Sequence, residues 1–218
     1  MVPTEQWERS AASGLEASTS LMDDFFRAQH HRPAALSDVD ASAVDPILRG
    51  VLTSDGTVTT LIAACLLQPL AVRVLDERNV GLATDMGRWL EAAPGALAVR
   101  RRVVIVVRVT RAPVYHAESF LLPERLPPEV ADSLRTEPLG LGGALRRHSA
   151  HVGRELLWYG QGQPLPWTGI PPHRPDEDLP VDPTLHRTYR LTAPNRQPAA
   201  LITESFSTGL LKSAHSLP

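Results

Sequence analysis

Glu204 is the residue of this sequence that is best placed to do chemistry, because it is a carboxylate inside an apolar segment. Residues 199–206 are predicted to form a strand, and alternation along it places Ala200, Ile202, Glu204 and Phe206 on one face. A carboxylate that faces a protein core is costly unless it is paired or has a function. Glu204 is therefore either a paired structural carboxylate or an acidic residue of a site.

Arg102 is the second candidate, because a guanidinium is permanently charged and can bind a carboxylate through two parallel hydrogen bonds. It begins the β-branched segment 102–109, which is predicted to be a central strand. Considered alone, an arginine at the end of a strand is more often a solvated charge. Arg102 is also the last of three consecutive arginines, so any of Arg100, Arg101 and Arg102 could be the one that enters a site.

Two backbone positions are candidates for binding an anion, because N–H groups at the N-terminus of a helix favour negative charge. Val58 begins the helix predicted for residues 58–67. Leu139 follows Pro138, which opens the helix predicted for residues 138–147. The backbone amides of Val58 and Leu139 could therefore hold a carboxylate.

The elements that must position these residues are strands joined by short turns, with helices before and among them. Asp45 and Pro46 are a typical N-cap and first residue of a helix. Helices are predicted at 46–52, 58–67, 127–134 and 138–147, and strands at 70–75, 102–109, 114–122, 154–159, 186–192 and 199–206. Short turns between successive strands favour an antiparallel sheet, so the predicted fold class is α+β.

The chain has 218 residues, which is enough for one domain and an extension. Residues 1–40 lack sustained periodicity and are predicted to be a flexible N-terminal arm, whereas residues 41–218 are predicted to form the domain. A long proline-rich loop is predicted at about 160–184. The single cysteine, Cys65, lies in an apolar segment and is predicted to be a small buried thiol.

Composition argues against several classes of partner. The net charge is −2, which gives no support for a nucleic-acid-binding face. No apolar run approaches the about 20 residues of a membrane span, and the N-terminus has no apolar signal core. The histidines lack the spacing of a metal site, so no metal is predicted. We expect a cytoplasmic protein without nucleic-acid or membrane partners, either a monomer or a dimer.

Four short segments occur in an informative order, namely 55–59 at a helix start, 102–105 in a strand, 137–140, and 187–191 together with Pro198 and 203–206. In this order, and with the strand at 117–123, they resemble the chorismate pyruvate-lyase family. The resemblance covers roughly residues 45–206.

This resemblance implies an antiparallel sheet with flanking helices and an internal ligand cavity. It implies a carbon–oxygen lyase of aromatic biosynthesis that cleaves chorismate to 4-hydroxybenzoate and pyruvate with no metal and no cofactor. The family's site arginine corresponds to Arg102, its site glutamate to Glu204, and its ligand-binding backbone amides to Val58 and Leu139. The alternative is a non-catalytic module of the same fold that binds an aromatic carboxylate, because this fold also occurs as the effector-sensing domain of transcription regulators.

Overall fold

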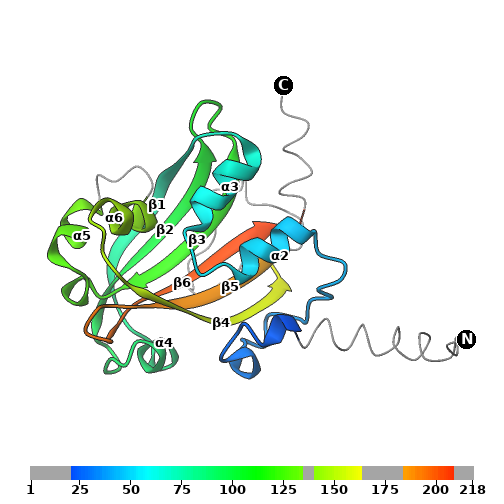
Figure 1. Cartoon of the computed structure of the whole chain (residues 1–218). Helices are drawn as coiled ribbons and strands as arrows, with labels where there is room; N and C mark the ends of the chain where they lie inside the picture. The colour runs from blue at the N-terminus through cyan, green and yellow to red at the C-terminus, as the bar shows by residue number, and fades with distance from the viewer. Residues whose placement is uncertain (1–20, 135–139, 164–183, 209–218) are drawn as a thin grey trace, which may run out of the picture.

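A six-stranded antiparallel sheet forms the centre of the molecule (Figure 1). The computed structural model describes residues 21–134, 140–163 and 184–208. The strands are β1 (Leu70–Gly81), β2 (Leu97–Val107), β3 (Pro113–Leu121), β4 (Gly153–Gly162), β5 (Thr184–Thr192) and β6 (Pro198–Ser207). Their order across the sheet is β1-β2-β3-β6-β5-β4, and all neighbours are antiparallel. The predicted α+β class is confirmed.

Four helices cover one face of this sheet, which we call the helix-covered face, and the opposite face is called the outer face (Figure 1). They are α2 (Pro46–Thr53), α3 (Val58–Leu66), α5 (Pro128–Ser133) and α6 (Gly140–Arg147). The Asp45 carboxylate caps α2 by accepting hydrogen bonds from the N–H groups of Ile47 at 2.8 Å and Leu48 at 3.3 Å. The predicted start of this helix is thus confirmed.

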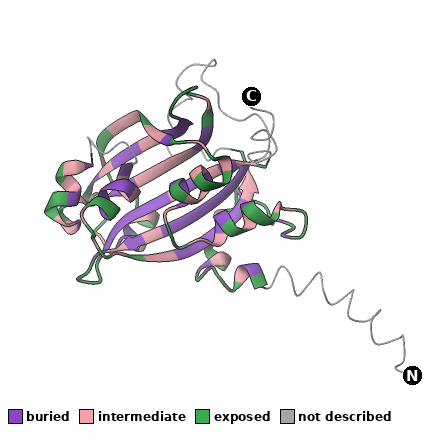
Figure 2. Ribbon diagram, turned by 45° about the horizontal axis from the view of Figure 1, so that its top comes forward, coloured by how far each residue is buried: buried purple, intermediate pink, exposed green. Residues whose placement is uncertain are grey.

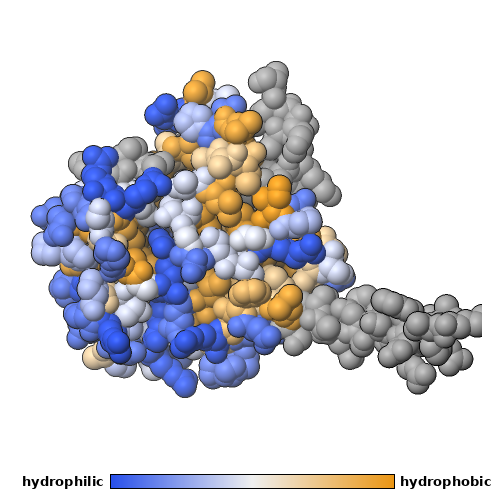
Figure 3. Space-filling view, viewed as in Figure 1, coloured by the Kyte–Doolittle hydropathy of each residue, from blue (hydrophilic) through white to orange (hydrophobic). Residues whose placement is uncertain are grey.

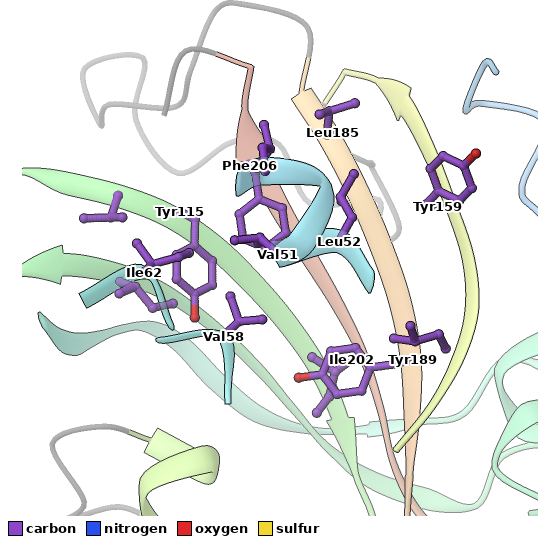
Figure 4. Packing of buried hydrophobic residues seen from close by; sticks show 14 of the residues in the cluster. Val51, Leu52, Val58, Ile62, Tyr115, Tyr159, Leu185, Tyr189, Ile202 and Phe206 are labelled. Carbon is purple, nitrogen blue, oxygen red and sulfur yellow. The ribbon is translucent and has the colours of Figure 1, made fainter. Parts of the chain in front are cut away.

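The main hydrophobic core lies between the sheet and helices α2 and α3 (Figure 4). Leu52 and Ile62 from the helices pack in the same cluster as Tyr115, Ile202 and Phe206 from β3 and β6. Strands β5 and β6 are mostly buried along their length (Figure 2). This burial holds helices α2 and α3 over the middle of the sheet.

A second core lies on the outer face, where the sequence predicted no element. The connection between β1 and β2 contains the short helix α4 (Thr84–Trp89), and Leu90 after it packs in a cluster with Phe120, Trp158 and Leu201. Helix α4 has one glycine and three polar or charged residues in six positions, so it carries no helical hydrophobic period.

Residues 21–40 do not form the flexible arm that was predicted for residues 1–40. The N–H groups of Arg27 and Ala28 donate to the carbonyls of Leu156 and Leu157 in β4, both at 2.9 Å. Phe26 is 5% exposed, so the segment also contributes to the core. This pairing covers an edge strand, and edge strands offer unpaired backbone groups to any segment that reaches them. Residues 1–20 lie outside the described part.

Gly160 of β4 packs closely against this N-terminal segment. A Cβ atom at Gly160 would lie 2.8 Å from Cδ of Arg32 and 2.8 Å from Cβ of Leu36. We expect Gly160→Ala to lower the free energy of unfolding by about 1–3 kcal/mol through overpacking, measured by chemical denaturation. The control is Gly153→Ala at the start of the same strand, where the nearest atom is Cβ of Thr192 at 3.7 Å. Equal stability of the two variants would contradict the packing described.

Cys65 is exposed, which corrects the prediction of a buried thiol. Helix α3 is apolar on both sides, and hydrophobic residues lie on the surface over it (Figure 3). The sequence pattern therefore could not show which side of the helix faces the sheet. Within the described ranges, none of the helices has the length and hydrophobicity that crossing a membrane requires.

Candidate active site

A pocket lies between the helix-covered face of the sheet and helices α3 and α6. It holds about 540 Å³ of empty space, a volume that includes its opening to solvent. Aliphatic side chains form much of the wall. The polar side chains that line it, among the described residues, are Thr59, Arg101, Tyr115, Ser119, Tyr189 and Glu204.

The register of the sheet brings most of these residues together. Residues that are paired across neighbouring strands face the same side of a sheet. Two adjacent rows, read from β2 through β3 and β6 to β5, are Val103–Ala117–Glu204–Arg187 and Arg101–Ser119–Ile202–Tyr189. Since β3 separates β2 from β6, the backbones that carry Arg101 and Glu204 are two strand spacings apart, about 10 Å.

Glu204 is both a paired carboxylate and a pocket residue, so the structure combines the two interpretations of its sequence. Its Oε2 accepts a hydrogen bond from Nε of Arg187 at 2.7 Å, and its Oε1 accepts one from the Tyr189 hydroxyl at 3.3 Å. The residue is only 6% exposed. Arg187 therefore balances the charge of the Glu204 carboxylate, while Glu204 still lines the pocket.

Arg187 is the residue that the sequence interpretation missed. It is 1% exposed, and its guanidinium also contacts the last turn of helix α2. One signal in the sequence could have found it, because Arg187 and Glu204 lie in the two strands of the predicted terminal hairpin. In the structure, the two residues pair directly across β5 and β6. The side chain of an arginine at such a position must either meet a carboxylate or pay a large cost of desolvation.

Two tyrosine hydroxyls add neutral polar groups to the pocket wall. The hydroxyl of Tyr115 and Oγ1 of Thr59 are 2.7 Å apart and share a hydrogen bond. Burial, followed by the nearby Glu204 carboxylate, raises the pKa of both Tyr115 and Tyr189 well above the ordinary value. Both phenols therefore stay protonated at neutral pH and can act as hydrogen-bond donors.

Arg101 is the guanidinium of the pocket. It is 5% exposed, and its Nη1 donates to the carbonyl of Leu134 at 3.0 Å and lies 3.5 Å from Oε2 of Glu77. Glu77 is on the neighbouring edge strand β1, opposite Arg101 in the register. Arg101 thus presents a permanent positive charge at the side of the pocket that lies away from Glu204.

The prediction that Arg102 enters the cavity with Glu204 is wrong, because successive residues of a strand point to opposite faces. In the register of the sheet, Arg102 lies opposite Glu118 of β3, and both residues are on the outer face. There it lies close enough to His116 to influence its titration. Arg101, one residue earlier, takes the place that the sequence analysis assigned to Arg102.

His116 on the outer face gives the protein a predicted dependence of stability on pH. Burial, with the charges of Arg102 and Arg73, lowers the pKa of His116 from 6.5 to about 4. The unfolded chain therefore binds more protons between these values, so the free energy of unfolding should fall as the pH drops from 6.5 to 4. The expected loss from this residue is about 3 kcal/mol.

The measurement is urea denaturation at several pH values, comparing the wild type with His116→Gln. The variant should lose less stability than the wild type across this window. His186, whose pKa burial also lowers, should leave part of the slope in place. Identical pH profiles for the two proteins would contradict the assignment to His116.

The two predicted backbone anion sites have different outcomes. Val58 is the first residue of α3, as predicted, and the next residue, Thr59, lines the pocket. The first amides of a helix have no intrahelical acceptor, so they are available to a ligand. Leu139 lies outside the described residues, although Gly140 and Leu141, which directly follow it at the start of α6, line the pocket.

Solved structures with a similar fold include domains of transcription regulators. The effector domain of PhnF from Mycobacterium smegmatis matches with a TM-score of 0.50 and 11% identity, over 71% of this chain and 90% of that chain. A GntR-family regulator from Bacillus cereus matches with a TM-score of 0.46 and 10% identity, over 63% of this chain and 90% of that chain. At these identities the likeness to PhnF shows the fold alone.

Comparison with family models gives a more specific finding. The model described as "Chorismate pyruvate-lyase Rv2949c-like" matches residues 52–214. This range contains Val58, Arg101 and Glu204, and it spans the whole pocket. No curated protein is similar enough in sequence to count as a match.

Proposed function

Because the chain belongs to the Rv2949c-like chorismate pyruvate-lyase family, we propose that it converts chorismate to 4-hydroxybenzoate and pyruvate. The observation that carries this proposal is one pocket lined by a buried guanidinium, Arg101, and a buried carboxylate, Glu204. The proposed enzyme needs neither metal nor cofactor, acts in the cytoplasm, and takes a small molecule as its only partner, without nucleic acid or membrane.

The chemistry of chorismate suits a site that binds and orients more than it attacks. Chorismate carries two carboxylates, a ring hydroxyl and an enolpyruvyl ether. In the elimination, the bond between the ring and the ether oxygen breaks and the neighbouring carbon loses a proton, so the ring becomes aromatic. The released enol becomes pyruvate when its methylene carbon takes up a proton. No covalent intermediate with the protein is required, and aromatisation drives the reaction.

In this proposal Arg101 binds one carboxylate of the substrate, because a guanidinium fork matches a carboxylate in geometry and charge. The backbone amides of Val58 and, by the family resemblance, Leu139 contribute the positive ends of two helices. Glu204 accepts a hydrogen bond from the ring hydroxyl through Oε1. The separation of about 10 Å between the two strands leaves room for a six-membered ring between these groups.

The rate acceleration then comes mainly from orientation and fixed charges. Groups that are already held in place do not have to reorganise as charge moves from the ring to the departing enolpyruvyl group. Tyr115 and Tyr189, whose phenols stay protonated, can donate hydrogen bonds to developing negative charge. Arg187 keeps Glu204 in place from behind, at 2.7 Å.

The second candidate function is a non-catalytic module that binds an aromatic carboxylate in the same pocket. The fold shared with the effector domain of PhnF supports it. A binder would use Arg101 and Glu204 in the same way and would need no further chemistry.

Incubation of the purified protein with chorismate, followed by chromatography, separates the two candidates. We expect 4-hydroxybenzoate and pyruvate to appear in equal amounts and faster than in a control without protein. Chorismate that stays unchanged, together with saturable calorimetric binding of 4-hydroxybenzoate, would support the binding module instead. If the protein neither converts chorismate nor binds 4-hydroxybenzoate, both candidates are contradicted.

A further inference from the structure

Arg187 lies behind the pocket, and its role is not explained by contact with a ligand. It is 1% exposed and is not among the described residues that line the pocket. Its closest charged neighbour is nevertheless a pocket residue, because its Nε donates to Oε2 of Glu204 at 2.7 Å.

The two oxygens of Glu204 have different environments as a result. Oε2 is turned back toward Arg187, whereas Oε1 is turned toward the hydroxyl of Tyr189 at 3.3 Å. The guanidinium of Arg187 also lies over the ring of Tyr189, with Cζ 5.0 Å from the ring centroid. Arg187 therefore restrains both the carboxylate and the phenol that neighbours it.

The other end of the same guanidinium holds helix α2. Its Nη1 donates to the carbonyls of Val51 at 2.7 Å, Leu52 at 3.2 Å and Ser54 at 2.7 Å. These carbonyls belong to the C-terminal end of a helix, where backbone acceptors lack intrahelical partners and carry partial negative charge. Arg187 is thus a C-terminal cap that comes from a distant strand.

Helix α2 leads directly to the wall of the pocket. It ends at Thr53, and α3 begins at Val58, so only the residues 54–57 separate the capped end from the first turn of α3. Thr59 in that turn lines the pocket beside Tyr115. One side chain therefore contacts both the acidic group on the sheet and the end of α2, from which a short turn leads to α3.

We infer that Arg187 is a positioning residue that sets the carboxylate of Glu204 and the N-terminus of α3 at a defined separation across the pocket. The inference rests on the proposed function and adds to it the reason why Glu204 faces the ligand with one oxygen. Lysine cannot replace arginine here, because a single ammonium cannot span the carboxylate and the three carbonyls.

The permanent charge that this role needs is maintained in the buried state. Burial alone lowers the pKa of Arg187, but the adjacent Glu204 carboxylate, by its charge and its hydrogen bond, favours the charged guanidinium, and the pKa is raised. The guanidinium is therefore protonated at every pH at which the protein is folded.

A double-mutant cycle on the folded protein tests this inference. Arg187→Gln should lower kcat/KM for chorismate by about 10–100-fold, since displacement of a reacting group by about 1 Å can cost about 100-fold. The loss should lie mainly in kcat, because Arg101 still binds the substrate. In a Glu204→Gln background, the same change should cost several-fold less than in the wild type, because the part of its role that acts through Glu204 is already lost. A purely structural role would give equal losses in both backgrounds.

Arg187→Lys serves as a second variant if Arg187→Gln does not fold. It keeps the charge but should still lose at least about tenfold in kcat. The matched control is Arg100→Lys on the outer face, because Arg100 is 3% exposed and its Nε donates to Oε1 of Glu118 at the same distance of 2.7 Å. The control should destabilise the protein comparably and keep kcat/KM within about threefold.

The outcomes separate this inference from the proposed function. If the wild type forms 4-hydroxybenzoate and Arg187→Lys is as active as Arg100→Lys, only the positioning role fails. If the wild type binds 4-hydroxybenzoate without turnover, the lyase proposal fails, and the same cycle is measured on the calorimetric Kd. If the wild type neither turns over chorismate nor binds 4-hydroxybenzoate, both fail together.

Discussion

Replacement of Arg101 by glutamine should lower kcat/KM for chorismate by about 100-fold or more, whereas the same replacement at Arg102 should change it by less than about threefold. Arg101 lines the pocket and is 5% exposed, so its side chain can present a desolvated positive charge to a carboxylate. Glutamine keeps a hydrogen-bond donor but loses the charge and the fork geometry.

The two variants make an unusually close comparison because the residues are neighbours in sequence and lie on opposite faces of β2. Release of 4-hydroxybenzoate is followed at several chorismate concentrations, after thermal unfolding has shown that both variants are folded at the assay temperature. Most of the loss for Arg101→Gln should appear as a higher KM. A larger loss for Arg102→Gln would mean that the outer face, and not the pocket, holds the substrate.

Glu204→Gln should lower kcat/KM by about 100-fold and should also destabilise the protein. The catalytic loss follows from removing the negative charge that meets the ring hydroxyl in a buried site. The loss of stability follows because Arg187 then keeps a buried charge without its carboxylate, and breaking such a pair costs about 3–5 kcal/mol. The loss of stability thus comes from the contact of 2.7 Å between Arg187 and Glu204, whereas the catalytic loss comes from the oxygen that faces the pocket.

Glu118→Gln is the matched control for this substitution. Glu118 also accepts a hydrogen bond from an arginine Nε at 2.7 Å, but it lies on the outer face beside Arg100. It should lose stability and keep its activity on chorismate. If Glu118→Gln and Glu204→Gln lose activity in parallel, the loss would reflect unfolding, and Glu204 would have no specific role.

Much of the fold could be predicted from local patterns, because helix caps and strand segments depend on neighbouring residues. The Asp45–Pro46 start of α2, the hairpin between β2 and β3, and the terminal hairpin of β5 and β6 all appear where they were expected. Helix α4 and the N-terminal segment were not predicted, because neither carries a periodic apolar pattern. They are held by contacts with parts of the chain that are distant in sequence.

The choice among the three arginines shows why the site could only be predicted in part. Strand β2 is covered on both faces, so valine or isoleucine occupies every position from Val103 to Val107. Without alternation between polar and apolar residues, nothing in the sequence assigns a face to Arg101 or Arg102. A shift of one residue in register would exchange them.

The sequence alone determined that Glu204 shares a strand face with apolar residues, because alternation is a local property of the backbone. It also determined that α3 would begin at Val58, since the turn before it and the apolar run after it are adjacent in the chain. Only the tertiary structure decided that Arg101 is the arginine in the pocket and that Arg187 is the partner of Glu204. Those outcomes depend on the register between strands and on which faces the helices cover, and both are set by packing between distant segments.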